Sequence, residues 1–207
     1  MGKFSSLEEV NSQYLDVLKE IGNVGAGNAT TAIANMLGLK IDMKVPSVKL
    51  LSFQEMGSAI CPEEEVICGI FLGVTDDIEG SMMFLMRLES ARYLVNILMM
   101  SPDNDSTEFN EMELSALKEI GNIIAGSYLN ALATMTNLKI QPSVPHLAID
   151  MAASILSVPA IMFGQYGDNC LMISTEFGDD VKIDGHFILL PELDSYEKIL
   201  TALGIPV

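Results

Sequence analysis

A hexapeptide, LKEIGN, occurs twice in this sequence, at residues 18–23 and again, unchanged, at residues 117–122. The two copies are 99 residues apart. The same offset relates three further identities: Ala26-Gly27 with Ala125-Gly126, 39–41 with 138–140, and Val45-Pro46 with Val144-Pro145. Identities that share one offset without a gap indicate an internal duplication. The fold must therefore accommodate the same unit twice, which predicts a pseudo-two-fold arrangement.

Each copy is predicted to contain the same order of elements. A long helix comes first, at 12–37 and at 110–136, and a shorter helix closes each copy, at 89–100 and at 194–205. Asn110 is placed to cap the second long helix. Between the helices, apolar and β-branched runs predict strands at 40–53, 65–74 and 80–88 in the first copy and at 139–151, 154–166, 170–177 and 185–193 in the second.

The expected fold class is α+β, with two long helices packed on a mainly antiparallel sheet. We expect a single domain over residues 1–207, made of two repeats at about 12–100 and 110–207 and a polar linker at about 101–109. Gly80 and Gly185 are 105 residues apart, so the second copy is expected to hold about six extra residues near 177–184. Since the duplication supplies both halves in one chain, we expect a monomer.

The composition limits the functions that this chain can have. Its formal net charge of -17 argues against nucleic acid and against anionic membrane surfaces, because both attract Lys and Arg. There is no secretory signal and no apolar run that suits a membrane span, so we expect a cytoplasmic protein. Cys61, Cys68 and Cys170 lack CxxC spacing, which predicts buried, reduced thiols. His146 and His186 are expected to be structural.

Three glycines near the first hexapeptide, Gly22, Gly25 and Gly27, suggest a phosphate-binding loop, but their context contradicts it. That loop needs a strand before the glycines and a helix that begins at them. Here the helical periodicity begins upstream, and the second copy has Ile124 in place of Gly25. A glycine inside a helix costs about 0.5–1 kcal/mol relative to alanine. Close packing against a neighbouring element explains Gly22 and Gly121.

Each long helix carries a polar stripe on one face. The members are spaced i, i+4, i+7 and i+11, which keeps them within a narrow arc at about 100° per residue. They are Asp16, Glu20, Asn23 and Gly27 in the first copy and Ser115, Glu119, Asn122 and Gly126 in the second. An ordinary solvated face needs only polarity, whereas both copies hold the same glutamate and the same asparagine. The repetition favours a functional stripe over a merely solvated one.

The chemistry of the stripe points to a partner protein. One carboxylate and one amide provide neither a nucleophile–base pair nor a metal cage, so they form a poor hydrolytic site alone. A neutral amide can donate to and accept from a water molecule and so orient it for attack, as a glutamine does in GTPases. A carboxylate can bind a cation on the partner. Glu20 and Asn23 lie about 4.5 Å apart along the helix axis, near enough to act on one small target.

These residues carry a resemblance to a known family. The pattern [DS]xxxExxN, followed by 22 residues and a proline, resembles the signature of the CheC/CheX/FliY phosphatases of bacterial and archaeal chemotaxis. It occurs as Asp16, Glu20, Asn23 and Pro46, and again as Ser115, Glu119, Asn122 and Pro145. The resemblance covers nearly the whole chain. Two motifs without a further domain resemble the CheC branch, since CheX carries one motif and dimerises and FliY adds a switch-protein domain.

The resemblance implies a phosphatase that acts on the phosphoaspartate of the response regulator CheY. Glu20 and Glu119 would pair with a lysine of the regulator, and Asn23 and Asn122 would position the attacking water. The Mg²⁺ would belong to the regulator, so no cofactor or metal ligand of this chain is expected.

The resemblance also implies supporting roles and a second partner. Asp16 or Ser115 would frame the site, Pro46 and Pro145 would shape it from beside the helix, and Gly27 and Gly126 would let the regulator approach the backbone. CheD, a receptor glutamine deamidase, would be the second partner, with Asp150 as a contact. Two alternatives stay open: a non-catalytic protein that binds CheD or phosphorylated CheY and acts by sequestration, and a flagellar-switch component.

Overall fold

The computed structural model describes residues 12–38, 42–101, 104–163, 169–178 and 183–204 of the 207. Over these residues the chain forms α1 (Ser12–Leu37), β1 (Asp42–Ser52), α2 (Phe53–Ile60), β2 (Val66–Asp76), β3 (Gly80–Arg87), α3 (Leu88–Leu98), α4 (Glu111–Thr136), β4 (Ile140–Pro142), β5 (His146–Met151), α5 (Ala152–Phe163), β6 (Asn169–Gly178), β7 (Ile183–Pro191) and α6 (Leu193–Ala202). The two long predicted helices are confirmed as α1 and α4, and the closing helices as α3 and α6.

The sheet is antiparallel and contains strands of both repeats. Its order is β1-β6-β7-β3-β2-β4, with β5 also paired to β2. The first strand of the first repeat, β1, pairs with β6 of the second, while β4 and β5 pair with β2 of the first. Each repeat therefore completes the part of the sheet that belongs to the other, which interlocks the two halves.

The pairing registers place a pseudo-two-fold axis at the centre of the sheet. In the first repeat Ile70 pairs with Phe84, and in the second Ile173 pairs with Phe187, so the strands correspond at an offset of 103. Across the repeats Phe84 pairs with Phe187, its own counterpart. Their rings stack with centroids 4.6 Å apart. The duplication seen in the sequence is thus expressed as symmetry in the sheet.

This offset corrects the predicted position of the extra residues. The sheet matches Gly80 with Ile183 and not with Gly185. α5 has 12 residues where α2 has 8, which accounts for the change of offset from 99 to 103. The starts of α3 and α6 are 105 residues apart, so two more residues are added near the end of β7. The prediction that the insertion lies near 177–184 is wrong.

The strand predicted over 154–166 is also wrong, because α5 covers most of it and contains Pro159. An apolar run of this length does not distinguish a strand from a buried helix. A signal exists in the first repeat, where Ser52 and Glu55 form a capping box that begins α2. Phe53 and Ala152, which begin the two helices, are 99 residues apart. The duplication would therefore have predicted α5 once α2 was recognised.

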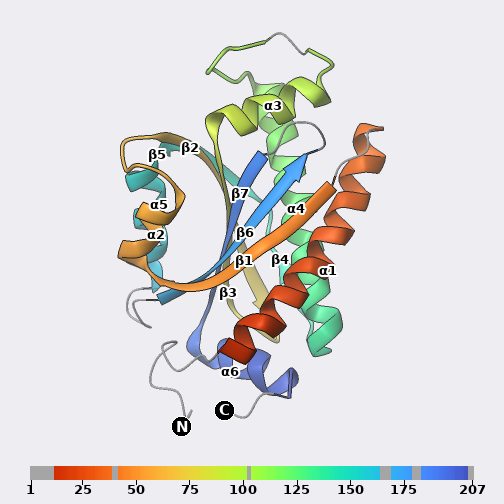
Figure 1. Ribbon diagram of the computed structural model, residues 1–207, viewed down its shortest axis with the longest axis vertical. Helices are drawn as coiled ribbons and strands as arrows, with labels where there is room; N and C mark the ends of the chain where they lie inside the picture. Colours follow the sequence, from red (N-terminus) through yellow and green to blue (C-terminus); the bar gives the residue numbers. More distant parts are fainter. Residues whose placement is uncertain (1–11, 39–41, 102–103, 164–168, 179–182, 205–207) are drawn as a thin grey trace.

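Helices cover both faces of the sheet, as Figure 1 shows. The long helices α1 and α4 lie side by side on one face, α2 and α5 lie on the other, and α3 and α6 lie at opposite ends. Two separate apolar clusters fill the layers. The larger lies under the long helices and includes Ile120 and Phe84, and the smaller lies under α2 and α5 and includes Met56 and Ile155. The layers leave the outer faces of α1 and α4 to solvent.

Candidate functional site

The two long helices run antiparallel and pack closely against each other (Figure 1). At their contact, a Cβ added to Gly25 would lie 2.8 Å from the Cα of Tyr128. Gly22 faces the sheet, where a Cβ would lie 3.3 Å from Val45 Cγ1, and Gly121 faces Ile70. The predicted packing role of Gly22 and Gly121 is confirmed. The glycines lie inside a continuous helix, so a phosphate-binding loop is excluded here.

Gly27 and Gly126 differ from these packing glycines. A Cβ added at either position would meet nothing within 4 Å. Each glycine costs about 1 kcal/mol of helix stability relative to alanine, and no contact within the described residues requires it. The open space over these two positions is consistent with the close approach of another molecule.

The structure places both stripes on exposed helix surface. Asp16, Glu20 and Asn23 are exposed on α1, and Ser115 and Glu119 are exposed on α4. Asn122 is half-buried and is the most enclosed polar side chain of the two stripes. The local helical periodicity that the sequence predicts is therefore sufficient to gather each carboxylate and its amide on one face.

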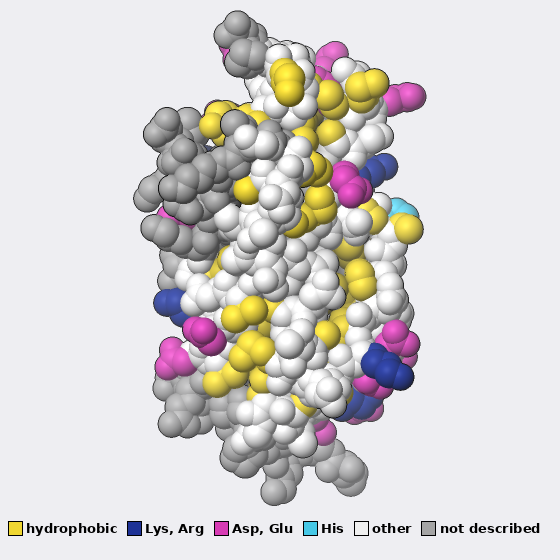
Figure 2. All heavy atoms as spheres, turned by 90° about the vertical axis from the view of Figure 1, so that its right-hand side faces the viewer, with side chains coloured by type: hydrophobic (Ala, Val, Ile, Leu, Met, Phe, Trp, Pro, Cys, Tyr) yellow, Lys and Arg dark blue, Asp and Glu magenta, His cyan; other side chains and the backbone are white. Residues whose placement is uncertain are grey.

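The two stripes point away from each other. Asn23 lies about 160° around α1 from Gly25, the residue that faces α4. Glu119 lies about 180° around α4 from Tyr128, which faces α1. The stripes therefore run along opposite flanks of the helix pair and form two separate sites. Figure 2 shows this face of the molecule, with Asp and Glu side chains toward its margins and an uncharged middle.

The two sites differ in their first residue. Ser115 donates its hydroxyl to the Glu111 carbonyl oxygen at 2.8 Å, one turn earlier in the same helix. Asp16, at the equivalent position of α1, adds an exposed carboxylate beside Glu20. The first site therefore carries one more negative charge than the second.

The two prolines of the pattern lie in equivalent positions beside the helices. Pro46 belongs to β1, where the pairing register with β6 shifts between Lys44 and Ser47. Pro145 is half-buried and immediately precedes β5. Val45, next to Pro46, contacts the helix at Gly22, one residue before Asn23. In the first repeat, the sequence pattern therefore combines residues of α1 with a proline at the irregular position of the edge strand β1.

The beginning of α4 is held by a buried ion pair that the sequence did not reveal. Arg92 of α3 donates to Glu113 at 2.8 Å, donates to the Glu108 carbonyl oxygen and lies over the Phe109 ring. Glu113 also accepts from the backbone N–H of Asn110, which completes the capping box. The Asn110 N–H, and then Arg92, hold the pKa of Glu113 below its ordinary value. This pair anchors the helix that carries Glu119 and Asn122.

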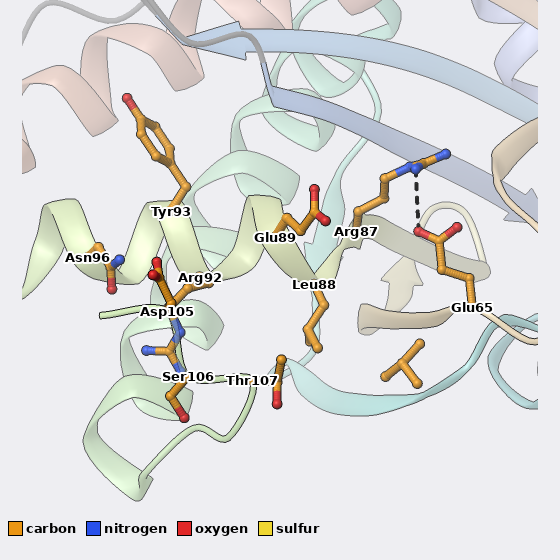
Figure 3. Close-up of a pocket in the computed structure, with 11 residues that line it drawn as sticks. Glu65, Arg87, Leu88, Glu89, Arg92, Tyr93, Asn96, Asp105, Ser106 and Thr107 are labelled. Atoms are coloured by element: carbon orange, nitrogen blue, oxygen red, sulfur yellow. Dashed lines mark ion pairs between the residues drawn. The ribbon is translucent and has the colours of Figure 1, made fainter. Parts of the chain in front are cut away.

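A pocket of about 600 Å³ lies apart from both stripes, between α3, the start of β2 and residues 105–107 (Figure 3). Arg87 and Glu65, which both line it, form an ion pair at 3.5 Å at one end of the pocket (Figure 3). Its other arginine, Arg92, is already bound to Glu113. The stripe residues, by contrast, lie on the outer helix surface, where Glu20, Asn23 and Glu119 are exposed, which suits a partner protein better than a small molecule.

Asp150 lies in the edge strand β5, on the face of the sheet that α5 covers and not on the face of the long helices (Figure 1). It is exposed and accepts a hydrogen bond from the Met151 backbone N–H at 2.7 Å. With His146, which is also exposed, it lines a shallow apolar pocket of about 220 Å³ between β5, β2 and α5. Two exposed apolar side chains belong to this surface: Met151, which follows Asp150 in the chain, and Val158, which lines the pocket. Asp150 therefore belongs to a strand, whereas both stripes belong to the long helices.

Among the residues that the structure describes, the other reactive side chains do not gather into a site. Cys61, Cys68 and Cys170 are free and buried, as predicted. Burial raises the pKa of Cys68 and of Cys170 to about 12. Burial in β7 lowers the pKa of His186. Within the described residues, no group of three His, Cys, Asp or Glu side chains could hold a metal ion, and no helix is long and apolar enough to cross a membrane.

Comparison with known proteins agrees with this arrangement. The CheC-like family matches residues 14–50 and 112–149, the two segments that contain the stripes and the Val-Pro pairs. The CheY-P phosphatase CheC of Bacillus subtilis (strain 168) is 38% identical over 209 residues, which cover 99% of each chain.

Solved structures show the same fold. The crystal structure of Thermotoga maritima FliY has a TM-score of 0.77 at 20% identity and covers 95% of this chain and 98% of its own. CheX from Borrelia burgdorferi, solved as a CheX-CheY-BeF3-Mg complex, has a TM-score of 0.50 at 16% identity and covers 84% of this chain and 96% of its own. Because the matched segments coincide with the two stripes and the likeness to the Bacillus subtilis protein extends over the whole chain, this chain belongs to the CheC-like family.

Proposed function

We propose that this protein is a phosphatase that removes the phosphoryl group from the phosphoaspartate of the response regulator CheY. The observation that carries the proposal is the Glu–Asn pair on the outer surface of each long helix, one turn before a glycine with open space above it. Both members of the pair on α1 are exposed, and on α4 Glu119 is exposed and Asn122 is half-buried. The relative named CheY-P phosphatase CheC supports the same activity, since its likeness extends over both pairs.

In this reaction Asn23 and Asn122 act on the attacking water. The side-chain amide accepts a hydrogen bond from the water and donates one to the phosphoryl oxygens, which aligns the water with the scissile bond. The water oxygen attacks phosphorus, the bond from phosphorus to the aspartate oxygen breaks, and the aspartate leaves as a carboxylate. The proton of the water passes to the released phosphate. A group oriented in advance in this way lowers the barrier because it does not have to reorganise during the reaction.

Glu20 and Glu119 position the partner. Each carboxylate lies about 4.5 Å along the helix from its asparagine, a separation that suits an ion pair with a lysine beside the phosphoaspartate. The regulator would bring this lysine, the phosphoryl group and its own Mg²⁺. This chain would supply only the carboxylate and the amide, which agrees with their place on open helix surface. Asp16 and Ser115, together with Pro46 and Pro145, would border the contact.

The decisive experiment is the decay of phosphorylated CheY in the presence of the wild type, Asn23→Ala, Asn122→Ala and the double variant. Loss of one oriented hydrogen-bonding group lowers the rate by roughly 10²–10³ at the affected site. We expect the double variant to leave CheY-P at its intrinsic decay rate. A double variant with the wild-type rate would refute the mechanism. A wild type that binds CheY-P without accelerating its decay would favour sequestration.

We also propose that the surface around Asp150 binds CheD. The support is an unpaired strand edge, since β5 pairs only with β2 among the described strands, next to a shallow apolar pocket that the exposed Val158 lines. Such edges bind partners by strand addition or by apolar packing. We expect Asp150→Asn to weaken CheD binding, measured by calorimetry. Asp194→Asn, an exposed aspartate on α6, is the control and should leave binding unchanged.

This surface is separate from the phosphatase sites, so Asp150→Asn should not change the decay of CheY-P measured without CheD. Equal binding of CheD by the wild type and by Asp150→Asn would remove Asp150 from the interface. We further expect the protein to act as a monomer and in the cytoplasm, together with its substrate. Sedimentation of the purified chain tests the first of these expectations.

A further inference from the structure

An apolar, β-branched residue follows the asparagine of each stripe: Val24 follows Asn23, and Ile123 follows Asn122. Val24 is 41% exposed and Ile123 is half-buried. A single exposed apolar residue is common on protein surfaces and carries no meaning alone. Here the same type of residue occupies the same place in both repeats, directly beside the proposed chemistry.

The fold does not account for Val24. Ile123 packs partly against the larger apolar cluster, whereas Val24 is absent from the described residues that form or contact either cluster. Val24 lies one turn after Glu20, about 40° around the helix, and three residues before Gly27, about 60° around it. Its side chain therefore stands beside the open space over Gly27, next to the Glu–Asn pair.

The surroundings of this position are suited to close contact. The chain has a net charge of -17, yet residues 21–37 and 120–136 contain no charged side chain. Figure 2 shows the uncharged middle of the helix face that these segments form. Contact with an uncharged surface avoids the free-energy cost of desolvating a charge. It also avoids repulsion between this acidic protein and a phosphorylated, negatively charged partner.

We propose that Val24 and Ile123 are apolar docking contacts for the phosphorylated regulator, an inference that rests on the proposed function. The regulator backbone would approach over Gly27 or Gly126, and the β-branched side chain would fill an apolar recess beside its phosphorylation site. Val24 and Ile123 are specificity-determining residues and not catalytic ones. Their contact is made equally in the ground state and in the transition state, so it acts on KM and not on kcat.

The test uses the Asn122→Ala variant, in which only the first site is active. Added to this background, Val24→Ala is expected to raise the KM for CheY-P by roughly fivefold or more, with kcat unchanged. Val24→Ile keeps an apolar, β-branched side chain and is expected to keep KM. Val66→Ala is the matched control, because Val66 is also 41% exposed but lies in β2, away from both stripes. It is expected to change neither constant.

Each other outcome overturns the inference in a different way. Equal KM and kcat in the Val24→Ala and parent proteins would show that Val24 makes no docking contact. A lower kcat at constant KM would show that Val24 acts on the placement of Asn23 and not on docking. If neither the wild type nor the Asn122→Ala parent accelerates decay, the proposed function itself fails, which separates the two conclusions. Ile123→Ala in an Asn23→Ala background repeats the test at the second site.

Discussion

Gly25 of α1 lies against Tyr128 of α4 so closely that a side-chain carbon on the glycine would come within 2.8 Å of the tyrosine Cα. The Tyr128 ring in turn packs 4.3 Å from Phe187, and its hydroxyl shares a hydrogen bond with the Thr175 hydroxyl at 3.0 Å. This chain of contacts ties both long helices to the centre of the sheet. It holds the two stripes on opposite flanks of the helix pair. Both candidate sites therefore depend on the contact between Gly25 and Tyr128, although neither residue is part of a stripe.

The first prediction concerns Gly25 and its matched neighbour Gly27. Gly25→Ala should destabilise the protein by about 1–3 kcal/mol, because the new methyl group meets backbone that cannot move aside. Gly27→Ala should stabilise it by about 0.5–1 kcal/mol, because alanine favours the helix and meets nothing. Urea denaturation at neutral pH measures both values. Equal effects of the two substitutions would contradict the close contact of the helices.

The second prediction concerns the ion pair between Arg92 and Glu113, both of which are buried. Glu113→Gln removes the negative charge but keeps an oxygen that can accept from Arg92, which also retains the Glu108 carbonyl. The substitution should therefore lower the free energy of unfolding by about 1–3 kcal/mol at pH 7, the difference between a charged and a neutral hydrogen bond in a buried site. The folded state holds the pKa of Glu113 below its ordinary value of 4.5. The ionised carboxylate therefore stabilises the fold above that pH, and its contribution is lost as the pH falls through the folded-state pKa.

The difference between the wild type and Glu113→Gln should accordingly shrink as the pH is lowered from 7 toward 3. Thermal unfolding over this range measures it. Glu111→Gln is the control, since Glu111 is an exposed glutamate in the same first turn of α4. If the stability lost in Glu113→Gln does not depend on pH, the pair stabilises the fold by packing and not by charge.

The third prediction follows from the opposite directions of the two stripes. Sites that share no residue and face apart should act independently, so their contributions to the phosphatase rate should add. The activities lost in Asn23→Ala and in Asn122→Ala should together equal the activity of the wild type, whatever the share of each site. Initial rates at saturating CheY-P test this. Complete loss of activity in both single variants would show that the sites depend on each other.

The fourth prediction concerns the thiols. Cys61, Cys68 and Cys170 are buried, and a pKa of about 12 for Cys68 and Cys170 leaves almost no thiolate at pH 8. None of the three should react with Ellman's reagent in the native protein, and all three should react in denaturant. Absorbance at equal protein concentration measures the difference. Rapid reaction of one thiol in the native state would identify local opening around it.

Much of the candidate site could be predicted from sequence because its parts are close together along the chain. Glu20 and Asn23 share a face by helical periodicity alone, and the repeat supplied the second pair at Glu119 and Asn122. The cap at Asn110 was equally local. Arg92 was not predicted as the partner of Glu113, since the two residues belong to different helices that meet only in the folded protein.

The errors in the fold have the same origin. The apolar run 154–166 fits a strand or a buried helix equally well. The helix α5 forms because it packs its apolar side against the sheet, with Ile155 in the smaller cluster. The predicted position of the extra residues is wrong because Gly80 and Gly185 look equivalent in sequence. Only the strand registers show that Gly80 corresponds to Ile183.

By itself, the sequence determined the duplication, the two long helices and the face on which each carboxylate joins its amide, because helical periodicity is a local property of the chain. Tertiary structure alone decided how the repeats interlock through β1 with β6 and through β2 with β5. It also decided which glycines face a closely packed neighbour and which have open space above them. These contacts set the direction in which each stripe points. These features depend on contacts between residues far apart in the chain, which no local pattern specifies.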